Sequence, residues 1–263
     1  MNSGKIIVAA SGGKGGVGKT SMLVNLAGLT ASKGFKVCLI DSDTGEEGDG
    51  SEGAHGASTF GMLRSRAIEQ GQEIAQIETY GASKDASLTS KLKDLSSIYD
   101  YVFVDTPGST SKALSSAIAM CDHLLLPMDM QRDEFLPLPP ILRLVESLEE
   151  NFELAGIDRK IDTLLVGTRI PKNYRIYTSI SAREEFLTWY QKRAQKVASL
   201  AQVIIPGVVP FKKTVSYGRT IHDLDDKDAR QYRGFVERLM DEIEGRRDRF
   251  ATRILSNDET EVS

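Results

Sequence analysis

Short apolar runs alternate along this chain with longer segments of helical spacing. The first run, residues 5–10, is rich in β-branched residues and ends at glycines, a pattern typical of a buried parallel strand. Over residues 20–33 the apolar positions recur at helical spacing, and Gly34 stands where a helix C-cap is expected. Residues 37–41 form a second apolar run. This strand, loop, helix and strand predict a parallel sheet with helices on its faces.

The same alternation continues toward the C-terminus. Further strands are expected at residues 101–105, 123–127, 161–167, 203–205 and 208–209. Helices are expected at about residues 112–120, 139–151, 179–200 and 228–244. Strands that alternate with helices predict an α/β fold, a doubly wound and mostly parallel sheet with helices on both faces. Because no linker divides the chain, we expect one domain over residues 1–255 and a flexible acidic tail over residues 256–263.

Composition is that of an ordinary soluble globular protein. Of the 263 residues, 40% are apolar and 27% are charged. The net charge of −4 does not favour nucleic-acid binding, although a local basic patch can act against the overall sign. Cys38 and Cys121 fall in apolar surroundings, as buried thiols in a reducing cytosol do. No apolar run approaches the roughly 20 residues that span a bilayer, and no signal peptide is evident, so we expect a cytoplasmic protein.

A glycine-rich loop joins the first predicted strand to the first predicted helix. Gly13, four intervening residues, Gly18, Lys19 and Thr20 match the full eight-position phosphate-loop pattern. Glycines let the backbone turn sharply and aim amide N–H groups at phosphate oxygens, and the helix N-terminus adds partial positive charge. Lys19 is expected at the β- and γ-phosphates and the Thr20 hydroxyl at Mg²⁺, so the predicted cofactors are ATP and Mg²⁺. The residues predicted to bind the nucleotide here are Gly13, Lys14, Gly15, Gly16, Val17, Gly18, Lys19, Thr20 and Ser21.

Lys14 is a second lysine that an ordinary phosphate loop does not need. The run from Lys14 to Thr20, Lys-Gly-Gly-Val-Gly-Lys-Thr, resembles the signature of the deviant Walker A ATPases, the ParA/MinD/Soj family. The chain is closest in pattern to small plasmid-type ParA partition ATPases. The resemblance implies a homodimer that closes on ATP, with Lys14 crossing to the partner's phosphates. The implied catalytic residues are Lys14, Lys19 and Asp43, and a solvated loop lysine is the alternative for Lys14.

Three aspartates follow or end predicted strands. Asp41 and Asp43 stand where the family carries Asp-x-Asp, and the resemblance implies that Asp43 positions the attacking water while Asp41 lies beside the metal. Phosphoryl transfer to water needs in-line attack and charge neutralisation, which such groups can supply. Asp105 ends an apolar run, as in a Walker B strand, and is expected to bind Mg²⁺ through water. The predicted metal site is therefore Thr20, Asp41 and Asp105.

Other segments match the family pattern or depart from it. Thr168 and Arg169 stand where relatives often carry Asn-Arg against adenine. Pro210 and Phe211 follow the next strand, where they could sandwich the purine, and packing at strand ends is the alternative for all four residues. The family usually has Pro-Gln after the second aspartate, and this chain has Thr44-Gly45, which leaves the geometry of the switch open.

The resemblance also implies a switch function and its partners. ATP binding would close the dimer, hydrolysis to ADP and phosphate would open it, and the two states would differ in affinity for DNA or a partner protein. The implied task is partition of a plasmid or chromosome, with a small ParB-like adaptor that stimulates hydrolysis. Lys192, Arg193 and Lys196 are candidates for binding DNA without sequence preference, although a solvated helix face is the commoner outcome for such residues.

Rival functions remain open. A MinD-like or cargo-positioning ATPase would act on a protein assembly or a membrane surface. Basic residues around Phe250 suggest a membrane helix, but the acidic tail follows at once, so we interpret them as the end of the last helix and expect no membrane partner. A small-molecule kinase would need an acceptor motif, which we do not find. A metal-cluster assembly ATPase would need interface cysteines, for which Cys38 and Cys121 are badly placed.

Overall fold

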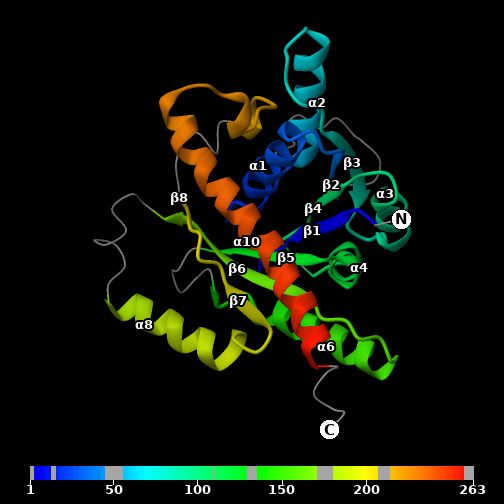
Figure 1. The fold of residues 1–263 in the computed structure, drawn as a ribbon, viewed down its shortest axis with the longest axis vertical. Coiled ribbons are helices and arrows are strands. Elements are labelled where there is room, and N and C mark those ends of the chain that lie inside the picture. The colour runs from blue at the N-terminus through cyan, green and yellow to red at the C-terminus, as the bar shows by residue number, and fades with distance from the viewer. Residues whose placement is uncertain are drawn as a thin grey trace.

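The computed structural model describes residues 3–12, 16–44, 56–108, 110–128, 135–170, 180–206 and 214–257. A central sheet runs through this part of the chain, with helices on both faces (Figure 1). Its strands are β1 Lys5–Ala9, β2 Val37–Thr44, β3 Glu78–Ser83, β4 Tyr101–Asp105, β5 His123–Met128, β6 Asp162–Ile170, β7 Ala198–Leu200 and β8 Ile205–Pro206. They lie in the order β3-β2-β4-β1-β5-β6-β7, β8 pairs with β6, and each of these pairings is parallel. The predicted doubly wound α/β fold is confirmed.

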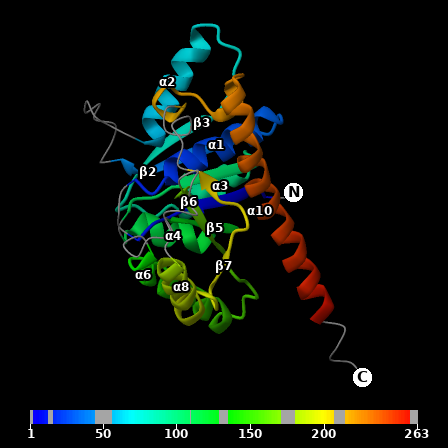
Figure 2. The same ribbon diagram turned by 90° about the vertical axis from the view of Figure 1, so that its left-hand side faces the viewer.

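Helices cover the two faces of the sheet in two groups. They are α1 Lys19–Ser32, α2 Ala57–Glu69, α3 Thr89–Ser96, α4 Lys112–Met120, α6 Pro139–Leu154, α8 Ile180–Trp189, η1 Tyr190–Ala194, η2 Ile221–Asp223 and α10 Lys227–Asn257. Buried residues of α1, α2, η2 and α10 pack with Ile7 and Ala9 of β1 on one face. Buried residues of α3, α4, α6 and α8 pack with Ile6 and Val8 on the other (Figure 2). Successive residues of β1 therefore enter opposite cores.

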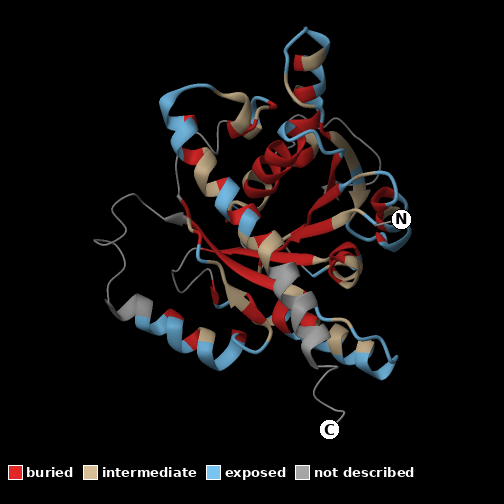
Figure 3. Cartoon of the chain, viewed as in Figure 1, coloured by how far each residue is buried: buried red, intermediate tan, exposed pale blue. Residues whose placement is uncertain are grey.

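The central strands β4 and β5 are buried along their whole length. Every residue of β4 and β5 is buried, whereas no residue of the edge strand β3 is. Figure 3 shows the buried strands at the centre and the exposed outer sides of the surrounding helices. Strands of a parallel sheet that are covered on both faces have nearly continuous apolar sequences. This is why the apolar runs of the sequence correctly predicted β1, β4 and β5.

The segment between β2 and β4 holds elements that the sequence pattern did not predict. α2, β3 and α3 lie within residues 57–96. β3 lacks buried positions and α3 has only 8 residues, so neither produces a long apolar period. β2 also continues beyond the predicted end at Asp41, as far as Thr44.

The helix predicted over residues 179–200 is wrong at its C-terminal end. α8 ends at Trp189, the short η1 follows, and Ala198–Leu200 form β7. β7 pairs with β6, because the backbone groups at the edge of β6 offer hydrogen bonds to an extended neighbour. The strand expected at residues 203–205 overlaps the observed β8 only at Ile205, because residues 203 and 204 are not in a strand, and residues 208–209 lie outside the described part of the chain. α10 runs to Asn257, beyond the end predicted at residue 244, and it includes the segment around Phe250, which confirms the interpretation of that segment as the end of the last helix.

Candidate functional site

The candidate site lies at the carboxyl ends of the central strands. β1 lies between β4 and β5, and the chain leaves β1 through a loop that leads into α1. Ligands of open α/β sheets bind beyond the carboxyl ends of the strands, at the point where the strand order reverses. The sequence-predicted phosphate loop is at this point. Gly13, Lys14 and Gly15 lie outside the described residues, so the predictions for them, including the role of Lys14, stay predictions.

The end of the loop is shaped to present the N-terminus of α1. Gly16 has a φ of 86° and Gly18 has a φ of 98°, a left-handed conformation that favours glycine. Gly18 is the N-cap residue of α1, no side chain caps this helix, and the first turn carries no acidic residue. The first amides of a helix and its dipole attract an anion such as a phosphate group. The geometry therefore agrees with phosphate binding at this position.

Lys19 and Thr20 open α1 and reach toward β1 and β4. The Lys19 ammonium group donates to the hydroxyl of the buried Ser11, with 3.2 Å between Nζ and Oγ. The Thr20 hydroxyl donates to Oδ2 of Asp105 at 2.5 Å. Asp105 is buried, and the hydroxyl of Ser42 donates to its backbone carbonyl at 2.9 Å. α1 and the Walker B-like strand β4 thus meet through Thr20 and Asp105, two residues of the predicted metal site.

These groups fit the ion that the sequence predicts. A hydroxyl and a carboxylate are oxygen donors, and Mg²⁺ in nucleotide sites is typically held by one or two protein oxygens, phosphate oxygens and several waters. Among the described residues no cluster of three or more His, Cys, Asp or Glu side chains could hold a metal alone. The side chains that would hold it are Thr20 and Asp105.

Asp41 lies beside this pair and has a contact that the sequence did not predict. It is in register with Asp105 on the neighbouring strand, and it is buried. Its Oδ2 accepts a hydrogen bond from the backbone N–H of Ser58 in the first turn of α2, at 2.9 Å. A carboxylate at a helix N-terminus satisfies an amide that has no partner within the helix. Asp41 therefore caps α2 and also lies next to the candidate metal site. The side chain of Asp43 lies outside the described residues, so its predicted role stays a prediction.

Thr168 contacts the backbone of the phosphate loop. Its hydroxyl donates to the backbone carbonyl of Val17 at 2.7 Å, and its side chain is only 2% exposed. The side chain of Arg169 and the residues Pro210 and Phe211 lie outside the described residues. The predicted base pocket therefore stays a prediction.

A buried ion pair connects α2 to η2. The Arg64 guanidinium donates to both carboxylate oxygens of Asp223, at 2.7 and 3.2 Å, and to the carbonyls of Ala75 and Gly218. Burial acts to raise the pKa of Asp223, but the hydrogen bonds and charge of Arg64, together with the bonds from Thr220, hold that pKa below its usual range. A single arginine in a polar segment gives no signal in the sequence, so this pair was not predicted.

Asn25 of α1, the helix that follows the phosphate loop, contacts η2. Its side-chain oxygen accepts from the backbone N–H of Ile221 at 2.7 Å, and its side-chain nitrogen donates to the carbonyl of Ser21 at 2.7 Å. α1 approaches the same segment closely at Gly28, where an added Cβ would stand 2.5 Å from the side chain of Thr220. Through these contacts the segment at η2 packs against the middle of α1, the helix that carries Lys19 and Thr20.

The comparison with known proteins agrees with this geometry. Residues 8–245 match the family model described as the CobQ/CobB/MinD/ParA nucleotide binding domain. The chain belongs to this family. It is similar to the chromosome partitioning protein ParA of Myxococcus xanthus, with 25% identity over 89% of this chain and 87% of that protein. It is also similar to the chromosome-partitioning ATPase Soj of Thermus thermophilus, with 27% identity over 90% of this chain and 96% of that protein.

A solved structure shares the fold of this ParA/MinD family member. The putative plasmid partition protein of Borrelia burgdorferi bound to AMPPNP matches with a TM-score of 0.59 and 18% identity, over 91% of this chain and 99% of that one. The ParA/MinD resemblance that the Lys14 to Thr20 run carried in the sequence is thus confirmed. The described part of the chain contains no helix that is long and apolar enough to cross a membrane.

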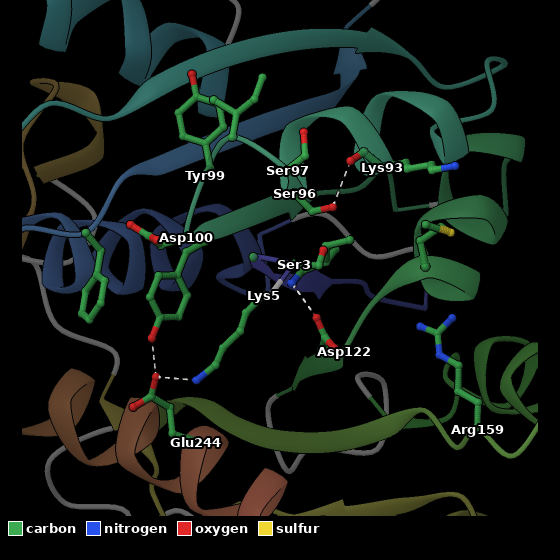
Figure 4. Close-up of a pocket in the computed structure, with 16 residues that line it drawn as sticks. Ser3, Lys5, Lys93, Ser96, Ser97, Tyr99, Asp100, Asp122, Arg159 and Glu244 are labelled. Carbon is green, nitrogen blue, oxygen red and sulfur yellow. Dashed lines mark hydrogen bonds and ion pairs between the residues drawn. The ribbon is translucent and has the colours of Figure 1, made fainter. Parts of the chain in front are cut away.

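A separate hollow of about 1070 Å³ lies at the opposite, amino-terminal edge of the sheet (Figure 4). On one side of it, Glu244 of α10 accepts hydrogen bonds from Lys5 at 2.9 Å and from the hydroxyl of Tyr101. Burial acts to raise the pKa of Glu244, and the bonds from Tyr101 and Lys5 outweigh it, so the pKa is lowered. These contacts anchor α10 of the ParA/MinD-type domain to β1 and β4, far from the phosphate loop.

Proposed function

We propose that this chain is a dimerising switch ATPase of the ParA type, which hydrolyses ATP to ADP and phosphate and thereby drives the partition of a plasmid or chromosome. The observation that carries the proposal is the hydrogen bond between Thr20 and Asp105, directly at the N-terminus of α1. This pair brings the end of the phosphate loop and the end of β4 together at one point. Such an arrangement serves phosphoryl transfer, in which catalysis consists mainly of positioning and charge stabilisation.

Each group of the site has a role in the proposed hydrolysis. Lys19 and the first amides of α1 hold the phosphates and balance their charge. Thr20 and Asp105 would hold Mg²⁺ together with the nucleotide, and the ion would supply positive charge against the phosphate oxygens. Asp43 orients the attacking water, and Asp41, beside the metal, helps to hold the metal and its waters. The leaving group is ADP, whose charge the same amides and Lys19 stabilise.

The switch depends on a second copy of the chain. We propose that ATP closes two subunits face to face, with Lys14 of each subunit contacting the partner's phosphates. A small activating adaptor of the ParB kind would then stimulate hydrolysis and open the dimer. A closed and an open state differ in the surfaces that they present, so each can have its own affinity for DNA.

Exposed basic residues support the proposed DNA contact. Lys192 and Arg193 lie on η1, Lys196 follows it, and all three are exposed. Contacts to backbone phosphates need positive charge and carry no sequence information. Binding of this kind loses affinity steeply as the salt concentration rises, which distinguishes it from a base-specific contact.

The experiment that tests the proposal compares phosphate release by the wild type with that by Asp43→Ala and Asp105→Asn. We expect Asp43→Ala to bind Mg·ATP and to lose hydrolysis by about two orders of magnitude, as expected for loss of a group that acts in the transition state. Asp105→Asn should also lose hydrolysis, and its affinity for ATP should depend less on Mg²⁺ than the affinity of the wild type does. Wild-type protein that releases no phosphate with DNA and adaptor present would contradict the proposal.

A positioning ATPase that acts on a membrane or a protein assembly is the second candidate. The observation in its favour is that α10 continues as a helix to Asn257 and so includes the basic segment around Phe250. The acidic residues Asp258, Glu259 and Glu261 follow at once and would be repelled by an anionic membrane. Sedimentation with DNA and with anionic liposomes, each with ATP, separates the two. Liposome binding without DNA binding would overturn the partition proposal.

A further inference from the structure

The contact between Thr168 and Val17 connects β6 to the phosphate loop. Thr168 lies near the carboxyl end of β6, and its hydroxyl donates to the Val17 carbonyl at 2.7 Å. Both residues are buried, so water has little access to this hydrogen bond. We propose that Thr168 is a positioning residue, which orients the Gly18 amide of the loop toward the nucleotide phosphates. This inference rests on the proposed binding of ATP.

The geometry of the peptide unit links the carbonyl of Val17 to the amide of Gly18. Among the described residues no peptide bond is cis, and in a trans peptide the C=O and the following N–H point in opposite directions. Since Thr168 holds the Val17 carbonyl toward β6, the Gly18 N–H points away from β6. Gly18 is also the N-cap residue of α1, the position from which a phosphate loop presents amides to its ligand. Holding one end of the peptide therefore fixes the direction of the other.

The surroundings of Thr168 make the contact rigid. Thr168 is paired with Ile205 of β8, which fixes its backbone, and a β-branched side chain has few χ1 rotamers. A Cβ added to Gly18 would stand 4.0 Å from the Cβ of Thr168, so the loop rests on this side chain. Glycine adopts positive and negative φ about equally readily, so an external contact can decide that Gly18 takes its φ of 98° and thereby which way the peptide turns.

The same contact argues against adenine recognition by the Thr168 side chain. A threonine hydroxyl has one hydrogen to donate, and here it is given to Val17, so the hydroxyl could meet another partner only through its oxygen lone pairs. With a side chain that is 2% exposed, the hydroxyl is turned into the protein and away from solvent. A residue that orients the loop affects every nucleotide with the same phosphates equally, whereas a residue that contacts the base affects ATP and GTP differently.

The test uses Thr168→Val, which removes the hydroxyl and keeps the shape, beside Thr168→Ser, which keeps the hydroxyl. Affinities for Mg·ATP and Mg·GTP are measured by calorimetry. We expect Thr168→Val to weaken the affinity for both nucleotides about tenfold, the size of one hydrogen bond to a charged group, with the ratio of the two unchanged. Thr168→Ser should stay within about threefold of the wild type. If Thr168→Val proves unfolded, Thr168→Ala tests the same loss without an added methyl group.

Thr163→Val is the matched control. Thr163 lies on the same strand, is also 2% exposed, and its hydroxyl donates to the carbonyl of Ile161 instead of the loop. It should leave both affinities at the wild-type value. Affinities equal to the wild type in Thr168→Val, or a changed ratio of ATP to GTP affinity, would overturn the inference. Wild-type protein that binds no ATP would instead refute the proposed function.

Discussion

Replacement of Arg64 by alanine tests the buried contact between α2 and η2. Arg64 is 1% exposed and makes five hydrogen bonds, two to Asp223, two to Ala75 and one to Gly218. Its removal leaves the Asp223 carboxylate buried without its cation, together with carbonyls that lose their donors. Breaking a buried ion pair in this way costs about 3–5 kcal/mol of unfolding free energy. For a chain of this size that corresponds to a fall in the melting temperature of about 10 °C.

The assay is urea unfolding followed by circular dichroism, with thermal melting as a second measurement. Arg66→Ala is the control, since Arg66 is exposed on the same helix and should change stability by no more than about 0.5 kcal/mol. The double variant Arg64→Ala with Asp223→Asn should lose less than the sum of the losses in Arg64→Ala and Asp223→Asn alone, because the two residues share one interaction. A loss below about 1 kcal/mol in Arg64→Ala, or additive losses in the double variant, would refute the reasoning.

Other features of the structure lead to further expectations. Asp41→Ala removes the side-chain oxygen that accepts from Ser58 in the first turn of α2, so the unfolding free energy should fall by about 1 kcal/mol, and an unchanged unfolding free energy would show that the contact with Ser58 contributes nothing. Burial and then the charge of Arg233 lower the pKa of His222 to about 4, so the unfolded chain binds the extra proton first as pH falls. Stability from this group is therefore complete above about pH 6.5 and is lost toward pH 4, and unfolding curves of His222→Gln should lack this slope, whereas an unchanged slope would assign it to other groups. Tyr101→Phe removes one hydrogen bond to Glu244 and should cost about 1 kcal/mol with nucleotide affinity unaltered, while an altered affinity would contradict the separation of the two edges of the sheet.

The parts of the fold that the sequence predicted are those that local pattern determines. β1, β4 and β5 are buried on both faces and therefore have continuous apolar sequences. The glycines and the Lys19-Thr20 pair form a motif because one backbone shape and two side chains suffice for phosphate binding. Asp105 was recognisable because it ends such a strand, and the structure places it against Thr20.

The rest depends on contacts between distant segments, which no local pattern contains. β7 forms because β6 offers it an edge, although its sequence continues a helical pattern. Arg64 is buried only because Asp223, 159 residues away in sequence, meets it. Thr168 was interpreted from a family position that faces adenine, but its hydroxyl contacts a carbonyl 151 residues earlier in the chain. These residues are chosen by tertiary structure, so their roles could be assigned only with the fold known.

The central claim is that ATP joins two copies of this chain and that Lys14 acts between them. The most direct measurement is the mass in solution by light scattering, for the wild type and for Lys14→Ala, with no nucleotide, with ADP and with Mg·ATP in the Asp43→Ala background that slows hydrolysis. The account predicts one chain without nucleotide or with ADP, two chains with Mg·ATP, and one chain throughout when Lys14 is replaced. A mass that stays the same with and without nucleotide, or a dimer that still forms in Lys14→Ala, would contradict it.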